Sequence, residues 1–207
     1  MAEYETEEEQ VEALKKWWKE NGTAVIAGAV LGVAALGGWR FWEHHQETQA
    51  AEASDLFASV QESLVSADTT ALQAQTDTMQ KKYKSTPYAA LATLHLAKSQ
   101  AEQGELAAAI EGLRWVVDNS KQDTVQNIAR IRLARALLAD SKLDEASAVI
   151  NHSIPQAYAS LVDEIRGDIF VAKGETEQAK QAYDQALESA SASGVEYLRM
   201  KRNNLGS

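Results

Sequence analysis

The chain has 207 residues, a formal net charge of −10 and a pI near 4.9. Binding to nucleic acid requires clustered Lys and Arg side chains that neutralise phosphates. The sequence has no such cluster and argues against this class of protein. The chain also has no cysteine, which excludes disulfides, thiolate catalysis and cysteine-ligated zinc.

Residues 1–21 form an acidic segment at the N-terminus. Glutamate is its most common residue, and its lysines are Lys15, Lys16 and Lys19. Because the segment is highly charged and lacks a strong apolar face before Val11, we predict a solvated, partly disordered tail. The alternative is a binding site for a basic partner.

Residues 22–42 form a predicted transmembrane helix. From Thr23 to Trp39 the sequence carries no charged side chain and is rich in Ala, Val, Leu, Ile and Gly. A helix of about 20 residues spans roughly 30 Å, which is the thickness of the hydrocarbon core of a bilayer. A buried core helix and a cleaved signal peptide are the alternatives. Tryptophans at both ends argue against the first, and the acidic start and the bulky residues 39–42 argue against the second.

Aromatic and basic side chains flank this span and predict its orientation. Tryptophans settle at membrane–water interfaces, so we expect interface anchors at both ends. These anchors are Trp17, Trp18, Trp39 and Trp42. Three lysines lie just before the span, whereas Arg40 is alone at its far end. The positive-inside rule therefore places the N-terminus in the cytoplasm and residues 43–207 across the membrane.

Ala24, Gly28 and Gly32 lie four residues apart and share one face of this helix. Small residues at this spacing let a second transmembrane helix approach closely. The sequence therefore predicts a contact with a partner transmembrane helix on this face. The alternative is that glycine is simply common in such helices.

From residue 43 onward the sequence predicts an all-α fold. Helix-forming residues dominate, and apolar residues recur at spacings of three and four. Similar turn segments occur at Gly104, Ser141 and Gly174, which are 37 and 33 residues apart. A tetratricopeptide repeat, which is a helix–turn–helix unit, has a period of about 34 residues. We therefore predict a tetratricopeptide-like helical-repeat solenoid.

Small residues recur where the two helices of each unit are expected to cross, since a larger side chain there would push the helices apart. They are Ala97, Ala134 and Gly167 on the first helices, and Ala109, Ala146 and Ala179 on the second helices. We expect residues 47–83 to add a long helix and a partner helix at one end. The last helix, which ends near Leu205, should cap the other end.

The stacked first helices of such repeats line a concave surface that binds peptides, helices or partner domains. In the repeat register, Lys98, Arg135 and Asp168 occupy equivalent positions that face this groove. Nearby apolar contacts would come from Leu91, Leu94, Ile128, Ile131 and Leu161. The alternative is that these apolar residues belong to the core.

The sequence does not indicate an enzyme. It contains no Gly-rich phosphate loop, nucleophile elbow or His-Glu-x-x-His pattern. Paired acids such as Asp163 and Glu164 are adjacent on a helix, whereas acid–base catalysis needs carboxyls that converge on one cleft. The neighbours His44 and His45 point to different helix faces and cannot hold a metal together. We therefore predict no catalytic residue, no metal site and no cofactor.

Five segments carry a family resemblance, namely residues 4–7, 10–15, 20–22, 31–42 and 200–205. Through them the sequence resembles the YfgM family, an ancillary subunit of the SecYEG translocon in Gram-negative bacteria. The resemblance covers the full length, and its N-terminal block is the most specific part.

The resemblance implies a single-pass inner-membrane protein with a cytoplasmic N-terminus and a periplasmic repeat domain, residues 43–207. It implies association with SecYEG and with the membrane-anchored periplasmic chaperone PpiD. It further implies help in passing translocated polypeptides to periplasmic chaperones, and a role of the cytoplasmic tail in stress-response regulation. The alternative function is an anchored scaffold for another envelope assembly or division complex.

Overall fold

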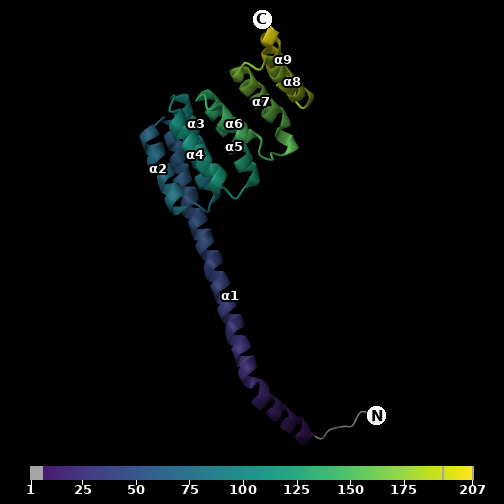
Figure 1. Cartoon of the computed structure of the whole chain (residues 1–207). Helices are drawn as coiled ribbons and strands as arrows, with labels where there is room; N and C mark the ends of the chain where they lie inside the picture. Colours follow the sequence, from purple (N-terminus) through teal and green to yellow (C-terminus); the bar gives the residue numbers. More distant parts are fainter. Residues whose placement is uncertain (1–6, 193, 207) are drawn as a thin grey trace, which may run out of the picture. The chain divides into compact units, whose positions relative to one another are not determined.

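A computed structural model describes residues 7–192 and 194–206, and within these residues it contains helices and no strand (Figure 1). The prediction of an all-α fold is confirmed. In chain order the helices are α1 (Glu7–Val65), α2 (Thr69–Lys82), α3 (Pro87–Glu102), α4 (Leu106–Asn119), α5 (Asp123–Ala139), α6 (Leu143–Ile150), η1 (Gln156–Tyr158), α7 (Ala159–Lys173), α8 (Thr176–Glu188), α9 (Val195–Asn203) and η2 (Asn204–Gly206).

Helix α1 belongs to both compact units of the chain. Unit 1 is Met1–Gln49 and unit 2 is Ala50–Ser207. The helix is already formed at Glu7, so the prediction of a partly disordered tail is wrong for residues 7–21. Residues 1–6 of that tail lie outside the described part of the chain. The helix also continues beyond residue 42, because strong helix formers such as Ala, Glu and Gln follow without a glycine or proline.

The large apolar side chains of α1 in unit 1 are exposed. Val30, Leu31, Val33 and Leu36 each expose more than 60% of their surface. Exposed apolar surface is unfavourable in water by about 25 cal/mol per Å², so a surface of this extent calls for an apolar environment. By length and composition, α1 qualifies as a helix that could cross a membrane. These properties fit a membrane-anchored protein.

Tryptophans pair at both ends of the apolar segment. The ring centroids of Trp17 and Trp18 are 6.5 Å apart, and those of Trp39 and Trp42 are 5.5 Å apart. Each pair presents an amphipathic aromatic surface, as expected for side chains at a membrane–water interface.

The described part of unit 2 contains four helical hairpins that are closed by the same type of turn, and α9 follows the last of them. One residue in each turn has a positive φ angle, and these residues are Ala67 (55°), Gly104 (80°), Ser141 (59°) and Gly174 (77°). The next amide in each turn donates a hydrogen bond to the carbonyl oxygen five residues earlier. These bonds are Asp68 to Ser63 (2.9 Å), Glu105 to Gln100 (2.8 Å), Lys142 to Leu137 (2.8 Å) and Glu175 to Phe170 (2.9 Å). This is the Schellman motif, and it gives each hairpin the same local geometry.

Small residues lie at the helix crossings, as the sequence predicts. The alanines named above at these crossings are buried. At Gly167 of α7, an added methyl group would overlap the ring of Tyr183 on α8. The contact between these two helices therefore requires glycine at this position.

Three apolar clusters hold unit 2 together. The largest joins α3 to α7, and its members include Leu113, Leu137 and Ile165. A second cluster packs the end of α1 against α2 and α3 around Val60 and Met79. A third cluster joins α8 to the C-terminal helix α9. The long first helix and the C-terminal cap predicted for the two ends of the solenoid are both present.

The turn geometry predicts opposite effects of substitutions at two equivalent positions. Ser141→Gly should stabilise residues 50–207 by about 0.5–1 kcal/mol, because glycine adopts a positive φ without steric cost. Gly174→Ala should destabilise them by about 1–2 kcal/mol, because the alanine side chain has a steric cost at the positive φ of this position. Urea unfolding measures both changes. Gly194, with φ of −93° and only ordinary contacts around an added methyl group, provides the control. Equal losses from Gly174→Ala and Gly194→Ala would contradict this role of the turns.

Candidate partner-binding groove

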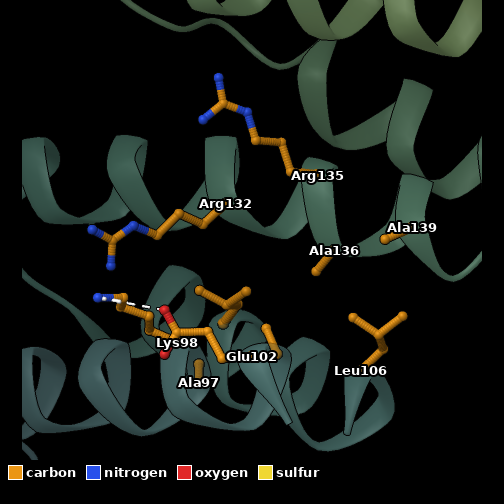
Figure 2. Close-up of a pocket in the computed structure, with 10 residues that line it drawn as sticks. Ala97, Lys98, Glu102, Leu106, Arg132, Arg135, Ala136 and Ala139 are labelled. Carbon is orange, nitrogen blue, oxygen red and sulfur yellow. Dashed lines mark ion pairs between the residues drawn. The ribbon is translucent and has the colours of Figure 1, made fainter. Parts of the chain in front are cut away.

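A groove of about 490 Å³ lies between α3 and α5, the first helices of two successive hairpins, and extends to α4 (Figure 2). Its lining is Ala97, Lys98, Ala101, Glu102, Leu106, Leu113, Arg132, Arg135, Ala136 and Ala139.

The groove is hollow because alanines of both helices line its floor. Ala97 and Ala101 lie on α3, and Ala136 and Ala139 lie on α5. These side chains end at Cβ, so they leave space between the helix axes that leucine would fill. Leu106 adds a half-buried apolar side chain at the start of α4. The floor of the groove is therefore apolar and open to a ligand side chain.

Positive side chains gather at one end of this groove. Figure 2 shows the Arg132 guanidinium and the Lys98 ammonium group at the same end, reaching from the two walls. His95 lies nearby, since both cations act on its imidazole. Burial lowers the pKa of His95, and the positive charges of Arg132 and Lys98 lower it further. This end of the groove therefore favours negative groups.

A second depression adjoins the groove at α7 and α9. It is lined by Arg135, Leu138, Ala139, Glu164, Asp168, Tyr197 and Lys201. Arg135 and Ala139 belong to both linings, so the two depressions are neighbours. A third depression next to α1 and α2 shares Lys98 and Glu102 with the groove. These three neighbouring depressions lie along the first helices of the hairpins and α9, and we call the surface that holds them the inner face.

A network of ionic hydrogen bonds fixes α9 on this inner face. Lys201 on α9 donates to Glu164 at 2.8 Å and to the two carboxylate oxygens of Asp168 at 2.8 and 2.7 Å. Tyr183 on α8 donates to Asp168 at 2.6 Å, and Arg135 on α5 donates to Glu164 at 3.3 Å. The Glu164 and Lys201 side chains are only 11% and 17% exposed. Buried charges need such partners. The network links the four helices α5, α7, α8 and α9.

The network shifts the pKa values of two of its members. Burial alone would lower the pKa of Lys201, but its hydrogen bonds to Asp168 and Glu164 outweigh this effect and raise it. Burial also raises the pKa of Tyr183, as does its hydrogen bond to Asp168. Both groups therefore hold their protons more tightly in the folded protein than in the unfolded chain.

The structure places the predicted groove residues in different environments. Lys98 and Arg135 line the groove, and Asp168 lines the adjoining depression. Leu94 and Ile131 are buried in the largest core cluster, so the expectation that they offer a surface to a partner is corrected. Helical spacing alone does not distinguish these core positions from the edge of the groove.

The other three apolar residues differ in exposure. Leu91 and Ile128 are half-buried and lie outside the lining of the groove. Leu161 on α7 is 38% exposed. A contact between any of them and a partner stays a prediction.

Two important residues of the inner face, Arg132 and Lys201, were not identified from the sequence. Arg132 precedes Arg135 by three residues and shares its helix face, so the helical period could have identified it. Lys201 could not be identified in this way, because its partners Glu164 and Asp168 are 37 and 33 residues away in sequence. Such pairing depends on the tertiary position of α9.

Comparison with known proteins places these features in a family. The family model for a tetratricopeptide repeat-like domain matches residues 15–207. A protein of Haemophilus influenzae named ancillary SecYEG translocon subunit is 33% identical over 96% of this chain and 97% of its own length. Its namesake in Escherichia coli is 31% identical over 98% of both chains. The Neisseria gonorrhoeae protein of the same name is 28% identical over 99% of this chain and 100% of its own. No solved structure shows a significant match.

The ionic network predicts a loss of stability on removal of its cation. Lys201→Met should destabilise residues 50–207 by about 1–3 kcal/mol, because Glu164 and Asp168 would remain largely buried without their nearest positive charge. Urea unfolding measures this loss. Arg199→Met on the same helix provides the control, since Arg199 pairs with Glu196 only at the surface. Its expected effect is below about 0.5 kcal/mol.

The same network predicts how stability changes at alkaline pH. The raised pKa values of Lys201 and Tyr183 increase the free energy of unfolding. This contribution is fully present below about pH 10 and is lost as the pH rises through the pKa values of the folded protein. The double variant Lys201→Met, Tyr183→Phe should therefore lose stability less steeply above pH 10 than the parent protein. Parallel losses in the two proteins would show that this network does not contribute.

Proposed function

This chain belongs to the family of ancillary SecYEG translocon subunits with a tetratricopeptide-like domain, and we propose that it is a membrane-anchored adaptor at the Sec translocon. In this role it would help to pass translocated polypeptides to periplasmic chaperones. The observation that carries the proposal is the inner face, which joins an apolar groove to charged side chains along the first helices of unit 2. Helical-repeat proteins bind partners on surfaces of this kind.

The adaptor would work from the outer side of the inner membrane. In the proposed topology, residues 1–21 are cytoplasmic, residues 22–42 span the membrane, and residues 43–207 are periplasmic. Lysines before the span support this orientation, and the exposed apolar side chains of α1 support the anchor. The cytoplasmic segment is short and acidic, which suits a second role as a binding site for a basic regulator.

Two surfaces would contribute to partner binding. Ala24, Gly28 and Gly32 share one face of α1, where a partner transmembrane helix could pack. Gly28 and Gly32 have free space around them, since an added Cβ would meet nothing within 4 Å. The inner face would hold a periplasmic segment of SecYEG or of the chaperone PpiD. Two weak contacts joined in one chain raise the overall affinity through effective concentration.

The topology is tested by reporters fused after Ser207. A reporter that is active only in the periplasm should be active, because the lysine bias places the C-terminal part across the membrane. A reporter that is active only in the cytoplasm should be silent at the same position. The reverse pattern would contradict the orientation and, with it, the periplasmic role.

The adaptor role is tested by co-purification from mild-detergent extracts. The joint change of Gly28 and Gly32 to Leu should reduce recovery of SecYEG or PpiD, because leucine would block close helix approach. The matched control changes Val30 and Ala34 to Leu on the opposite face of the same helix. Recovery of division or other envelope proteins in place of SecYEG and PpiD would support the alternative scaffold function. Loss of recovery in the control as well would remove the evidence for a specific helix face.

A further inference from the structure

The groove between α3 and α5 has a local charge opposite to that of the whole chain. Three cationic side chains line it, Lys98, Arg132 and Arg135, against one carboxylate, Glu102. The chain as a whole carries a formal charge of −10. A positive site in a concave, apolar surface concentrates the electrostatic field and attracts negative groups. The groove is therefore complementary to a partner that most of this protein would repel.

The positive groups of the groove retain capacity for a ligand. Arg132 is exposed and forms no ion pair with any residue that the structure describes. Lys98 pairs with Glu102 at 3.6 Å, but both side chains are about two-thirds exposed, so this pair contributes little. Arg135 has five N–H donors and donates from Nη2 to Glu164, a carboxylate that Lys201 also neutralises. A carboxylate ligand could thus pair with solvent-exposed donors of Lys98, Arg132 and Arg135.

Apolar surface lies directly beside these charges. Leu106 and the alanines of α3 and α5 form the floor, and the guanidinium of Arg132 and the ammonium group of Lys98 mark one end of it (Figure 2). A ligand with only negative charge would leave the apolar floor exposed to water. A ligand with only apolar side chains would leave the cations unpaired. The arrangement fits a ligand that combines both properties.

We propose that this groove binds an acidic, amphipathic segment of a partner protein, in which an apolar side chain lies on the alanine-lined floor and flanking Asp or Glu side chains pair with Lys98 and Arg132. The inference rests on the proposed adaptor function and specifies the chemistry of the segment that the adaptor recognises. Arg135, at the junction with the second depression, is placed to bind a further carboxylate. Affinity comes from apolar burial, and selectivity for acidic segments comes from the cations.

The test is a binding titration of the full-length chain in detergent micelles with short fluorescent peptides. One peptide is built from leucine and glutamate, a second from leucine and glutamine, and a third from leucine and lysine. Fluorescence anisotropy should show about tenfold tighter binding of the glutamate peptide than of the glutamine peptide, which corresponds to about 1.4 kcal/mol. Added salt should reduce this difference. Equal binding of all three peptides would overturn the proposal, because the groove would then be insensitive to charge.

Variants of exposed residues assign the binding to the groove. Changing Lys98 and Arg132 together to Gln should abolish the preference for the glutamate peptide. The control changes Lys121 and Lys180 to Gln, two exposed lysines outside the groove lining. Ala139→Glu should weaken binding of the glutamate peptide more than the isosteric Ala139→Gln does. A preference that survives in the Lys98, Arg132 variant would place the site elsewhere and overturn the proposal.

Two further outcomes separate this inference from its premise. Co-purification of SecYEG with the Lys98, Arg132 variant, together with failure of the parent protein to prefer the glutamate peptide, would overturn the inference and leave the adaptor function intact. Peptide preference without co-purification from the parent protein would support the groove chemistry and reject the translocon as its partner.

Discussion

The repeated turn is the constraint on which the rest of unit 2 depends. In each hairpin, one residue with a positive φ angle and one hydrogen bond across five residues end the first helix and start the second. This geometry is repeated in each hairpin, and successive hairpins are stacked by packing of α2 on α3, α4 on α5 and α6 on α7. Small residues at the crossings then allow the two helices of a hairpin to pack closely. The inner face therefore depends on both the recurring turn within each hairpin and the packing between hairpins.

These four turns show what the sequence could and could not predict. Gly104 and Gly174 are identifiable because glycine adopts a positive φ without steric cost, and Ser141 follows from their spacing. Ala67 adopts the same conformation with φ of 55°, yet nothing about alanine signals it. The apolar periodicity of Leu94 and Ile131 was likewise evident, but whether they face the core or the groove depends on how the hairpins stack. Local chemistry thus predicted the class and period of the fold, and tertiary packing decided which side chains are available to a partner.

The two units have different relations to water. In unit 2 the apolar side chains are buried in three clusters, and its buried charges are paired through the network around Lys201. In unit 1 the side chains of α1, such as Leu31 and Val33, are exposed along the predicted span. A single helix cannot bury its own apolar surface, so this segment requires a bilayer or partner helices to cover it. The sequence therefore specifies an anchor and a self-contained helical domain in one chain.

We infer that the inner face is the surface through which this protein contacts its partners. Photo-crosslinking in intact cells tests it most directly, with a crosslinking amino acid placed at Ala139 on the inner face or at Lys180 on α8 outside the groove lining. Adducts with SecYEG or PpiD are expected from position 139, and far fewer are expected from position 180. Adducts with these proteins from position 180 alone would contradict the claim and move the binding surface to the second helices of the repeats.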